Sequence, residues 1–165
     1  MNTLILMRHA KSDWSNPKQR DIDRPLNPRG KKAALLMGKW LKDNNHVPNF
    51  VICSTAVRTR ETLGRIRLCT EIGAKDIKYD ASLYEASQQT LFDIVKDAPW
   101  HKGSIMVLGH NPGIEDLLTY LCDSDFQLSK SGKLMPTASI AIIELPKKVE
   151  SGKGKLVQLI RPKEL

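Results

Sequence analysis

The chain has 165 residues, a length typical of one compact domain, and we expect a single domain over residues 1–165. Hydrophobic residues make up 41% of the sequence and charged residues 27%, so it can build a core and lacks the composition of a disordered chain. The 26 lysines and arginines against 18 aspartates and glutamates give a net charge of +8, which favours an anionic partner. Nucleic acid, a phosphorylated molecule and an acidic surface are all compatible with this charge.

The sequence contains neither a stretch typical of a membrane-spanning segment nor a cysteine pair typical of a metal site. No apolar run approaches the roughly 20 residues that a membrane-spanning helix needs. The first apolar run leads directly into Arg8-His9 without the pattern of a cleaved signal peptide. The three cysteines, Cys53, Cys69 and Cys122, are widely spaced and form no C-x-x-C pair. We therefore expect a cytoplasmic protein with reduced cysteines, no zinc or dithiol site and no membrane partner.

Strands and helices are predicted to alternate along the chain. Apolar runs predict buried strands, apolar residues at helical spacing predict helices, and Asn27-Pro28 is a typical helix start. In chain order, the predicted elements are a strand at 3–7, a helix from Pro28 to about 43–45 with Ala33, Leu36, Met37, Trp40 and Leu41 on its apolar face, a strand at 50–53, a helix from Thr55, a helix at 88–97, a strand at 104–108, a helix after Pro112, and strands at 138–145 and 155–161.

This alternation predicts an α/β fold: three αβα layers around a mainly parallel central sheet, with an antiparallel strand at the C-terminal end. The turn Ser151-Gly152-Lys153-Gly154 predicts a hairpin between the last two strands. Residues 11–29 are the longest polar, proline-bearing segment, and loops of this length in compact domains are often functional.

Charged and polar side chains follow three of the predicted strands. Arg8-His9 follows the first strand, a segment ending in Arg58 follows the second, and Gly109-His110-Asn111 follows the third. In parallel α/β sheets, ligands bind at the carboxyl ends of the strands, so we expect these residues to meet at one edge. Arg58 would lie in the first turn of its helix, where a cation is unfavourable unless an anion neutralises it, and a bound phosphate would do so.

Each of these residues also has a purely structural interpretation. Arg8 could be a solvated strand end, and it can share a ligand with His9 only if the backbone turns there. His110 could be a buried histidine with satisfied hydrogen bonds. Arg58 could pair with Glu61, three residues further along the same helix face.

Three segments together resemble a known family: LMRHAKSDW (6–14), CSTAVRTRETL (53–63) and VLGHNPG (107–113). They are similar to the histidine phosphatase superfamily, whose fold is that of phosphoglycerate mutase. The short chain points to the branch of SixA-type phosphohistidine phosphatases. One departure is Ala10, where the superfamily motif has glycine.

The resemblance implies a metal-independent phosphatase without a cofactor. It implies that His9 is the nucleophile and forms a phosphohistidine intermediate, while Arg8, Arg58 and His110 bind the phosphoryl oxygens. Glu85 matches by position the proton donor of larger members, although a surface glutamate is an equally good interpretation. Arg24 and Asn111 are expected to contact the substrate, whereas Arg24 could instead form surface pairs with Asp21 and Asp23.

Other mechanisms and classes fit less well. A cysteine-dependent phosphatase needs five residues between its cysteine and arginine, but Cys53 and Arg58 enclose four. A non-enzymatic RNA or polyanion-binding module would interleave aromatic and basic residues, and aromatics are only 5% here. We expect the substrate to be phosphohistidine on a protein, because 165 residues leave no room for a large insertion over the site. A small phosphoester is the alternative substrate.

Two histidines and the lysines of the C-terminal segment are expected on the solvated surface: His46, His101, Lys147, Lys148, Lys153, Lys155 and Lys163.

Overall fold

A computed structural model describes residues 1–165 and contains one six-stranded mixed sheet. The strands are β1 (Asn2–Arg8), β2 (Phe50–Cys53), β3 (Ile77–Tyr79), β4 (Ile105–Gly109), β5 (Ile140–Leu145) and β6 (Lys155–Ile160). They stand in the order β3-β2-β4-β1-β5-β6. The first four run parallel, whereas β5 pairs antiparallel with both β1 and β6. The predicted mainly parallel sheet, with an antiparallel strand near the C-terminal end, is confirmed.

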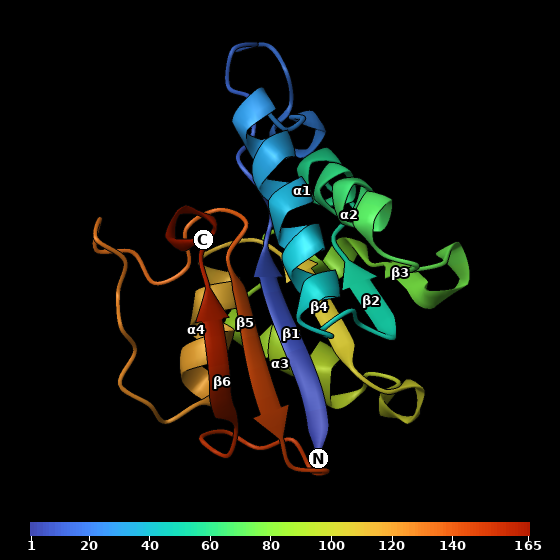
Figure 1. Cartoon of the computed structure of the whole chain (residues 1–165), viewed down its shortest axis with the longest axis vertical. Helices are drawn as coiled ribbons and strands as arrows, with labels where there is room; N and C mark the ends of the chain where they lie inside the picture. The colour runs from blue at the N-terminus through green and yellow to red at the C-terminus, as the bar shows by residue number, and fades with distance from the viewer.

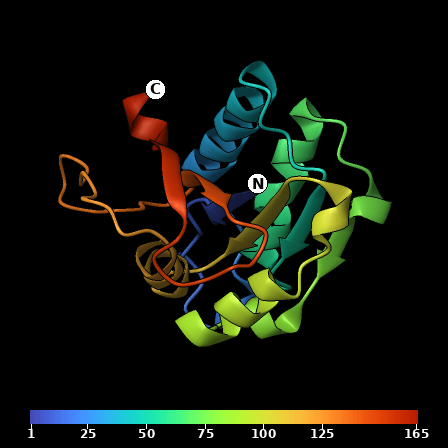
Figure 2. The same ribbon diagram turned by 90° about the horizontal axis from the view of Figure 1, so that it is seen from below.

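Four helices cover the two faces of this sheet (Figures 1 and 2). The helices are α1 (Pro28–Asp43), α2 (Val57–Cys69), α3 (Gln88–Lys96) and α4 (Gly113–Leu121). Side chains alternate along β1, so Ile5 and Met7 enter the buried cluster that contains residues of α1 and α2. Leu4 and Leu6 enter the cluster that contains residues of α3 and α4. The three predicted layers are therefore present, and none of the helices combines the length and apolar character that crossing a membrane requires.

The start of α1 follows the sequence prediction. The Asn27 side chain accepts a hydrogen bond from the Gly30 N–H at 2.8 Å, and Pro28 is the first helical residue. Gly30 lets the helix lie directly against the chain that follows β1, because a Cβ at this position would come within 2.1 Å of the Lys11 carbonyl oxygen. The helix start is thereby held next to the residues that follow β1.

Two local predictions are wrong, and one strand was missed. Helix α2 begins at Val57 rather than Thr55, because the backbone of Ala56 is still extended. The Ala56 N–H donates a hydrogen bond to the Ser54 hydroxyl at 3.3 Å. Strand β3 was not predicted, since this short edge strand has no apolar run. Leu36 was expected on the buried face of α1 but is 42% exposed, because the buried stripe of the helix is centred on neighbouring positions.

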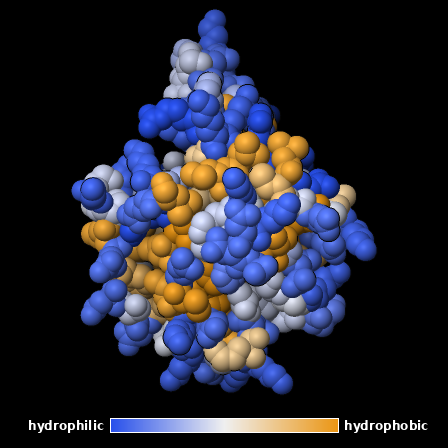
Figure 3. Space-filling view, in the orientation of Figure 1, coloured by the Kyte–Doolittle hydropathy of each residue, from blue (hydrophilic) through white to orange (hydrophobic).

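The carboxyl ends of β1, β2 and β4 meet at one edge of the sheet, at the top in Figure 1. Arg8 stands opposite Gly109, and Cys53 stands opposite Leu108. The start of α1 and the C-terminus lie at the same end of the molecule. Figure 3 shows that hydrophilic residues cover this end, whereas apolar residues gather over the middle of the same face. The expected ligand edge is therefore polar and accessible.

Candidate active site

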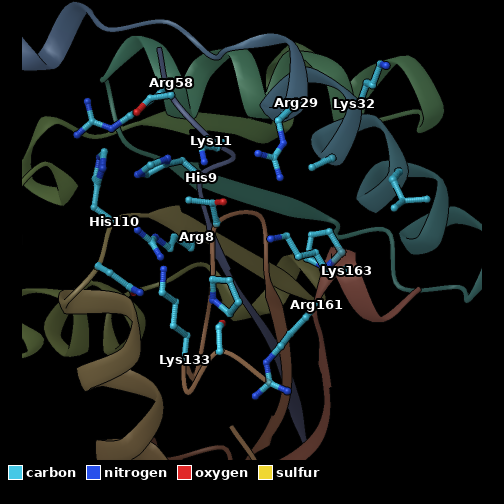
Figure 4. Close-up of a pocket in the computed structure, with 18 of the residues that line it drawn as sticks. Arg8, His9, Lys11, Arg29, Lys32, Arg58, His110, Lys133, Arg161 and Lys163 are labelled. Atoms are coloured by element: carbon cyan, nitrogen blue, oxygen red, sulfur yellow. The ribbon is translucent and has the colours of Figure 1, made fainter. Parts of the chain in front are cut away.

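A cleft of about 630 Å³ opens at this edge and is lined by 21 residues. It contains Arg8 at the end of β1, His9 directly after it, Arg58 on α2 and His110 between β4 and α4. Figure 4 shows these four side chains close together on one side of the cleft. The sequence prediction that they converge is confirmed.

His9 is held by the backbone that leaves β1. The backbone N–H of His9 donates to the Gly109 carbonyl at 3.0 Å, and the backbone carbonyl of His9 accepts from the Ala138 N–H at 2.9 Å. The ring Nδ1 lies 2.6 Å from the Ala10 carbonyl oxygen, which can only accept, so Nδ1 carries the hydrogen. The Ala10 N–H in turn donates to the Thr62 hydroxyl at 3.0 Å. This arrangement leaves the His9 Nε2 lone pair free in the neutral ring.

The electrostatic environment keeps His9 neutral. His9 is 8% exposed, and burial lowers its pKa from 6.5 to about 3, with smaller contributions in the same direction from His110, Arg58 and Arg8. The rings of His9 and His110 lie 5.2 Å apart. A neutral imidazole with one free nitrogen is a competent nucleophile near pH 7.

His110 is buried beside His9 and has one unpaired ring nitrogen. Its Nε2 lies 2.8 Å from the Ser54 hydroxyl, whereas its Nδ1 is buried and has no hydrogen-bond partner in the protein. The rings of Tyr84 and His110 are nearly perpendicular, with their centres 5.5 Å apart. Burial, and to a smaller extent the charge of Arg58, lowers the pKa of His110 to about 4. His110 is therefore also neutral at pH 7.

Two arginines complete this side of the cleft. Arg8 donates from Nη1 to the Met135 carbonyl at 3.1 Å, and Arg58 donates to the Asp21 carbonyl at 2.7 Å and to its carboxylate at 3.0 Å. The Nε atoms of both arginines are buried without a partner, like His110 Nδ1. Buried polar groups in proteins are nearly always paired, so three unpaired nitrogens around one histidine indicate a site for an acceptor-rich ligand. An oxyanion such as a phosphoryl group has that chemistry.

Asp21 organises the arginines, and sequence reasoning missed this role. Its carboxylate accepts from Arg58, from Arg24 at 2.7 and 3.0 Å, and from the Tyr84 hydroxyl at 2.5 Å. These bonds, that of Tyr84 above all, hold the pKa of Asp21 well below its usual range. Burial and the bond to Asp21 raise the pKa of Tyr84 to about 12. The alternative partner Glu61 is not bonded to Arg58, because its carboxylate accepts from the Leu26 N–H at 2.8 Å instead.

Arg24 and Asn111 both line the cleft. Arg24 is buried, donates to the Ser12 hydroxyl at 2.5 Å and lies 3.4 Å from the centre of the Trp14 ring. The Asn111 amide donates to the Met135 carbonyl at 3.1 Å, so it ties the loop before β5 to the site. Arg24 thus combines the two interpretations that the sequence left open, since it pairs with Asp21 and also faces the cleft. The functional segment expected at 11–29 supplies several of the lining residues.

The remaining candidates lie elsewhere or have another role. Glu85 is exposed and does not line the cleft, so its role as a proton donor stays a prediction. Cys53 is buried outside the cleft, and burial raises the pKa of its thiol to about 12, which disfavours a thiolate nucleophile. Lys163 was expected only as part of a solvated face but lines the cleft, because the C-terminal turn folds back beside α1. Sequence reasoning also missed four basic residues of the lining, which no motif singles out: Arg29, Lys32, Lys133 and Arg161.

The lowered pKa values of the two histidines predict a pH-dependent stability. Between pH 6.5 and about 4 the unfolded chain binds more protons than the folded chain, so the free energy of unfolding falls as the pH is lowered through this window. We expect a loss of up to a few kcal/mol from this cause, measured by urea unfolding at fixed pH. A double variant, His9→Asn with His110→Asn, should have a flatter profile, and the exposed His101→Asn should not. An unchanged slope in the double variant would show that the histidine pKa values are not lowered.

Comparison with known proteins agrees with this geometry. The family model of the histidine phosphatase superfamily (branch 1) matches residues 4–90. An uncharacterised protein of Mycobacterium tuberculosis is 34% identical over 143 residues, which cover 84% of this chain and 87% of that protein. The chain belongs to the histidine phosphatase superfamily.

Solved structures place it beside SixA-type members of the superfamily. A candidate phosphohistidine phosphatase SixA from Agrobacterium tumefaciens has a TM-score of 0.81 and 28% identity, covering 98% of this chain and 99% of that one. The protein histidine phosphatase SixA in complex with tungstate has a TM-score of 0.83 and 21% identity, covering 98% of each chain. The resemblance inferred from the three sequence segments is confirmed.

Proposed function

We propose that this histidine phosphatase removes the phosphoryl group from phosphohistidine on a protein, through a phosphohistidine intermediate on His9. The observation that carries the proposal is the free Nε2 of His9 beside three buried nitrogens without partners. The likeness to the candidate SixA phosphatase of Agrobacterium tumefaciens supports the substrate.

In the first step, the Nε2 lone pair of His9 attacks phosphorus while the bond to the leaving group breaks. Arg8, Arg58 and His110 donate to the phosphoryl oxygens as charge develops there. His110 can donate from Nδ1 when the Ser54 hydroxyl donates to its Nε2, so Ser54 acts as a positioning residue. In the second step, water attacks phosphorus, phosphate leaves, and the electron pair of the N–P bond returns to His9.

The leaving group decides how much acid catalysis is needed. An imidazole has a pKa near 6.5 and can take its proton from solvent before it departs, so the demand for a protein acid is low. The exposed position of Glu85 outside the cleft is compatible with this substrate. An alkyl phosphoester, with its poorer leaving group, would need a stronger proton donor, and the one carboxylate of the cleft, Glu164, is already paired with Arg161.

A small phosphoester is the second candidate substrate, because a volume of about 630 Å³ also falls in the range of small-molecule sites. The deciding experiment measures phosphate release, with EDTA present, from a phosphohistidine protein and from an aryl phosphate. Faster turnover of the phosphohistidine protein supports the proposal. Turnover of the aryl phosphate alone would favour the second candidate, and inactivity on both would leave a phosphate-binding module. Loss of activity in EDTA would contradict the metal-free mechanism.

Asp21→Asn should reduce kcat by about 10²-fold with a smaller change in KM, because Arg24 and Arg58 lose the charged partner that fixes their geometry. The Tyr84 hydroxyl should also titrate at lower pH, which ultraviolet absorbance follows directly. Asp23→Asn is the matched control, since Asp23 pairs with the exposed Arg20. Equal activity in both variants would exclude a positioning role for Asp21.

A further inference from the structure

The cleft extends beyond the residues that hold the phosphoryl group. In Figure 4, Arg8, His9, Arg58 and His110 occupy one side, while Arg29, Lys32 and Lys163 lie on the other. The cleft also has room for more than one phosphoryl group, at about 630 Å³. A substrate anchored at His9 therefore reaches this second side with another of its parts.

The cleft as a whole is strongly basic. Nine of its 21 lining residues are lysine or arginine, two of them Arg8 and Arg58 beside His9, and the one carboxylate, Glu164, pairs with Arg161 at 3.2 Å. Arg161 also donates to the Leu134 carbonyl at 3.0 Å, so its guanidinium is used in holding the loop before β5. Besides Arg8, five cations of the cleft form no ion pair with any carboxylate of the chain. We call these five the cationic wall: Arg29, Lys32 and Lys163 on the second side, and Lys11 and Lys133 nearer His9 and Arg8 (Figure 4).

The position of Arg29 adds an independent argument. It lies in the first turn of the 16-residue helix α1, which contains no acidic residue in that turn. A helix N-terminus carries a partial positive charge, so a cation there is unfavourable and an approaching anion is favoured. Lys32 follows three residues later on the same side of the helix. The protein thus concentrates positive charge that it does not itself neutralise.

We propose that the cationic wall binds acidic side chains that flank the phosphohistidine of a protein substrate. Only three of the 21 lining residues are hydrophobic, so the wall is not built for an aromatic or aliphatic group. Four of its five members are lysines, whose long flexible side chains suit carboxylates at varying positions better than one fixed phosphate. An acidic polypeptide segment therefore fits better than a small bisphosphate. The inference rests on the proposed phosphatase function.

The test uses two phosphohistidine peptides, one with Asp and Glu on both sides of the phosphohistidine and one with Asn and Gln at the same positions. The variant is Arg29→Glu with Lys32→Glu, and acidic residues at the start of α1 do not oppose helix formation. The control is Lys147→Glu with Lys148→Glu, which makes the same change in charge beyond the end of β5, at the opposite edge of the sheet. Steady-state kinetics are measured at low and high salt, with an aryl phosphate and a small bisphosphate as further substrates.

We expect wild type to prefer the acidic peptide, and the wall variant to raise its KM on the order of tenfold without changing kcat. Turnover of the neutral peptide and the aryl phosphate should be unchanged, the salt dependence should weaken, and the control should behave like wild type. Equal turnover of both peptides by wild type would overturn the inference while the proposed function stands. Preference for the bisphosphate over both peptides would assign the wall to small molecules. Activity on the aryl phosphate alone would refute the proposed phosphohistidine substrate and, with it, the inference.

Discussion

His9→Ala should lower the rate of phosphate release by about 10⁴-fold or more, because the nucleophile is removed and water must attack phosphorus directly. The rate is measured with a phosphohistidine protein and with an aryl phosphate. Binding of inorganic phosphate should persist in this variant, since Arg8, Arg58 and His110 remain in place. The loss should therefore appear in kcat.

The intermediate gives this prediction a second readout. Wild type quenched during turnover of a radiolabelled substrate should carry a label that is labile in acid and stable in alkali, as expected of a phosphoramidate. His9→Ala should carry none, and His101→Ala, on the exposed surface, should match wild type in both label and rate. A label retained by His9→Ala would place the nucleophile on another residue, with His110 the first to examine.

Arg58→Ala should reduce kcat by about 10³-fold, because one donor to the developing phosphoryl charge is lost. The fold should survive, since Asp21 keeps its bonds to Arg24 and Tyr84 and is partly open to solvent. Circular dichroism and thermal unfolding check this point. The activity is measured with the two substrates used for His9→Ala.

Two further variants test whether Arg58 acts through directed hydrogen bonds or only through its positive charge. Arg58→Lys keeps the charge but places all its N–H donors on one nitrogen, which cannot reproduce the bonds that Arg58 makes from two separate nitrogens to the Asp21 carbonyl and carboxylate, so it should restore little activity. Arg60→Ala removes an exposed arginine two residues further along α2 and should be nearly silent. Similar losses in Arg58→Ala and Arg60→Ala would mean that general positive charge, rather than directed hydrogen bonds, supports the reaction.

The part of the site around His9 was predictable from sequence because it is built from short segments at strand ends. Arg8-His9 and Gly109-His110 follow apolar runs, and the topology of a parallel sheet brings such positions to one edge. The start of α1 at Asn27 and Pro28 was equally predictable from sequence, because the asparagine cap and the proline at the first helical position are local preferences of the backbone. Local pattern and strand order therefore determine the fold class and the meeting of Arg8, His9, Arg58 and His110 at the proposed phosphoryl site.

Tertiary structure alone decided which charged side chains are neighbours. The link from Asp21 to Arg58 spans 37 positions and that to Tyr84 spans 63, so no local spacing reveals either. The cationic wall likewise joins residues after β1, at the start of α1, in the loop before β5 and at the C-terminus. Each of these charges alone is typical of a solvated surface, and Lys163 was predicted as such. Their common role follows from long-range packing, which decides where side chains meet, whereas the sequence pattern decides which elements they sit on.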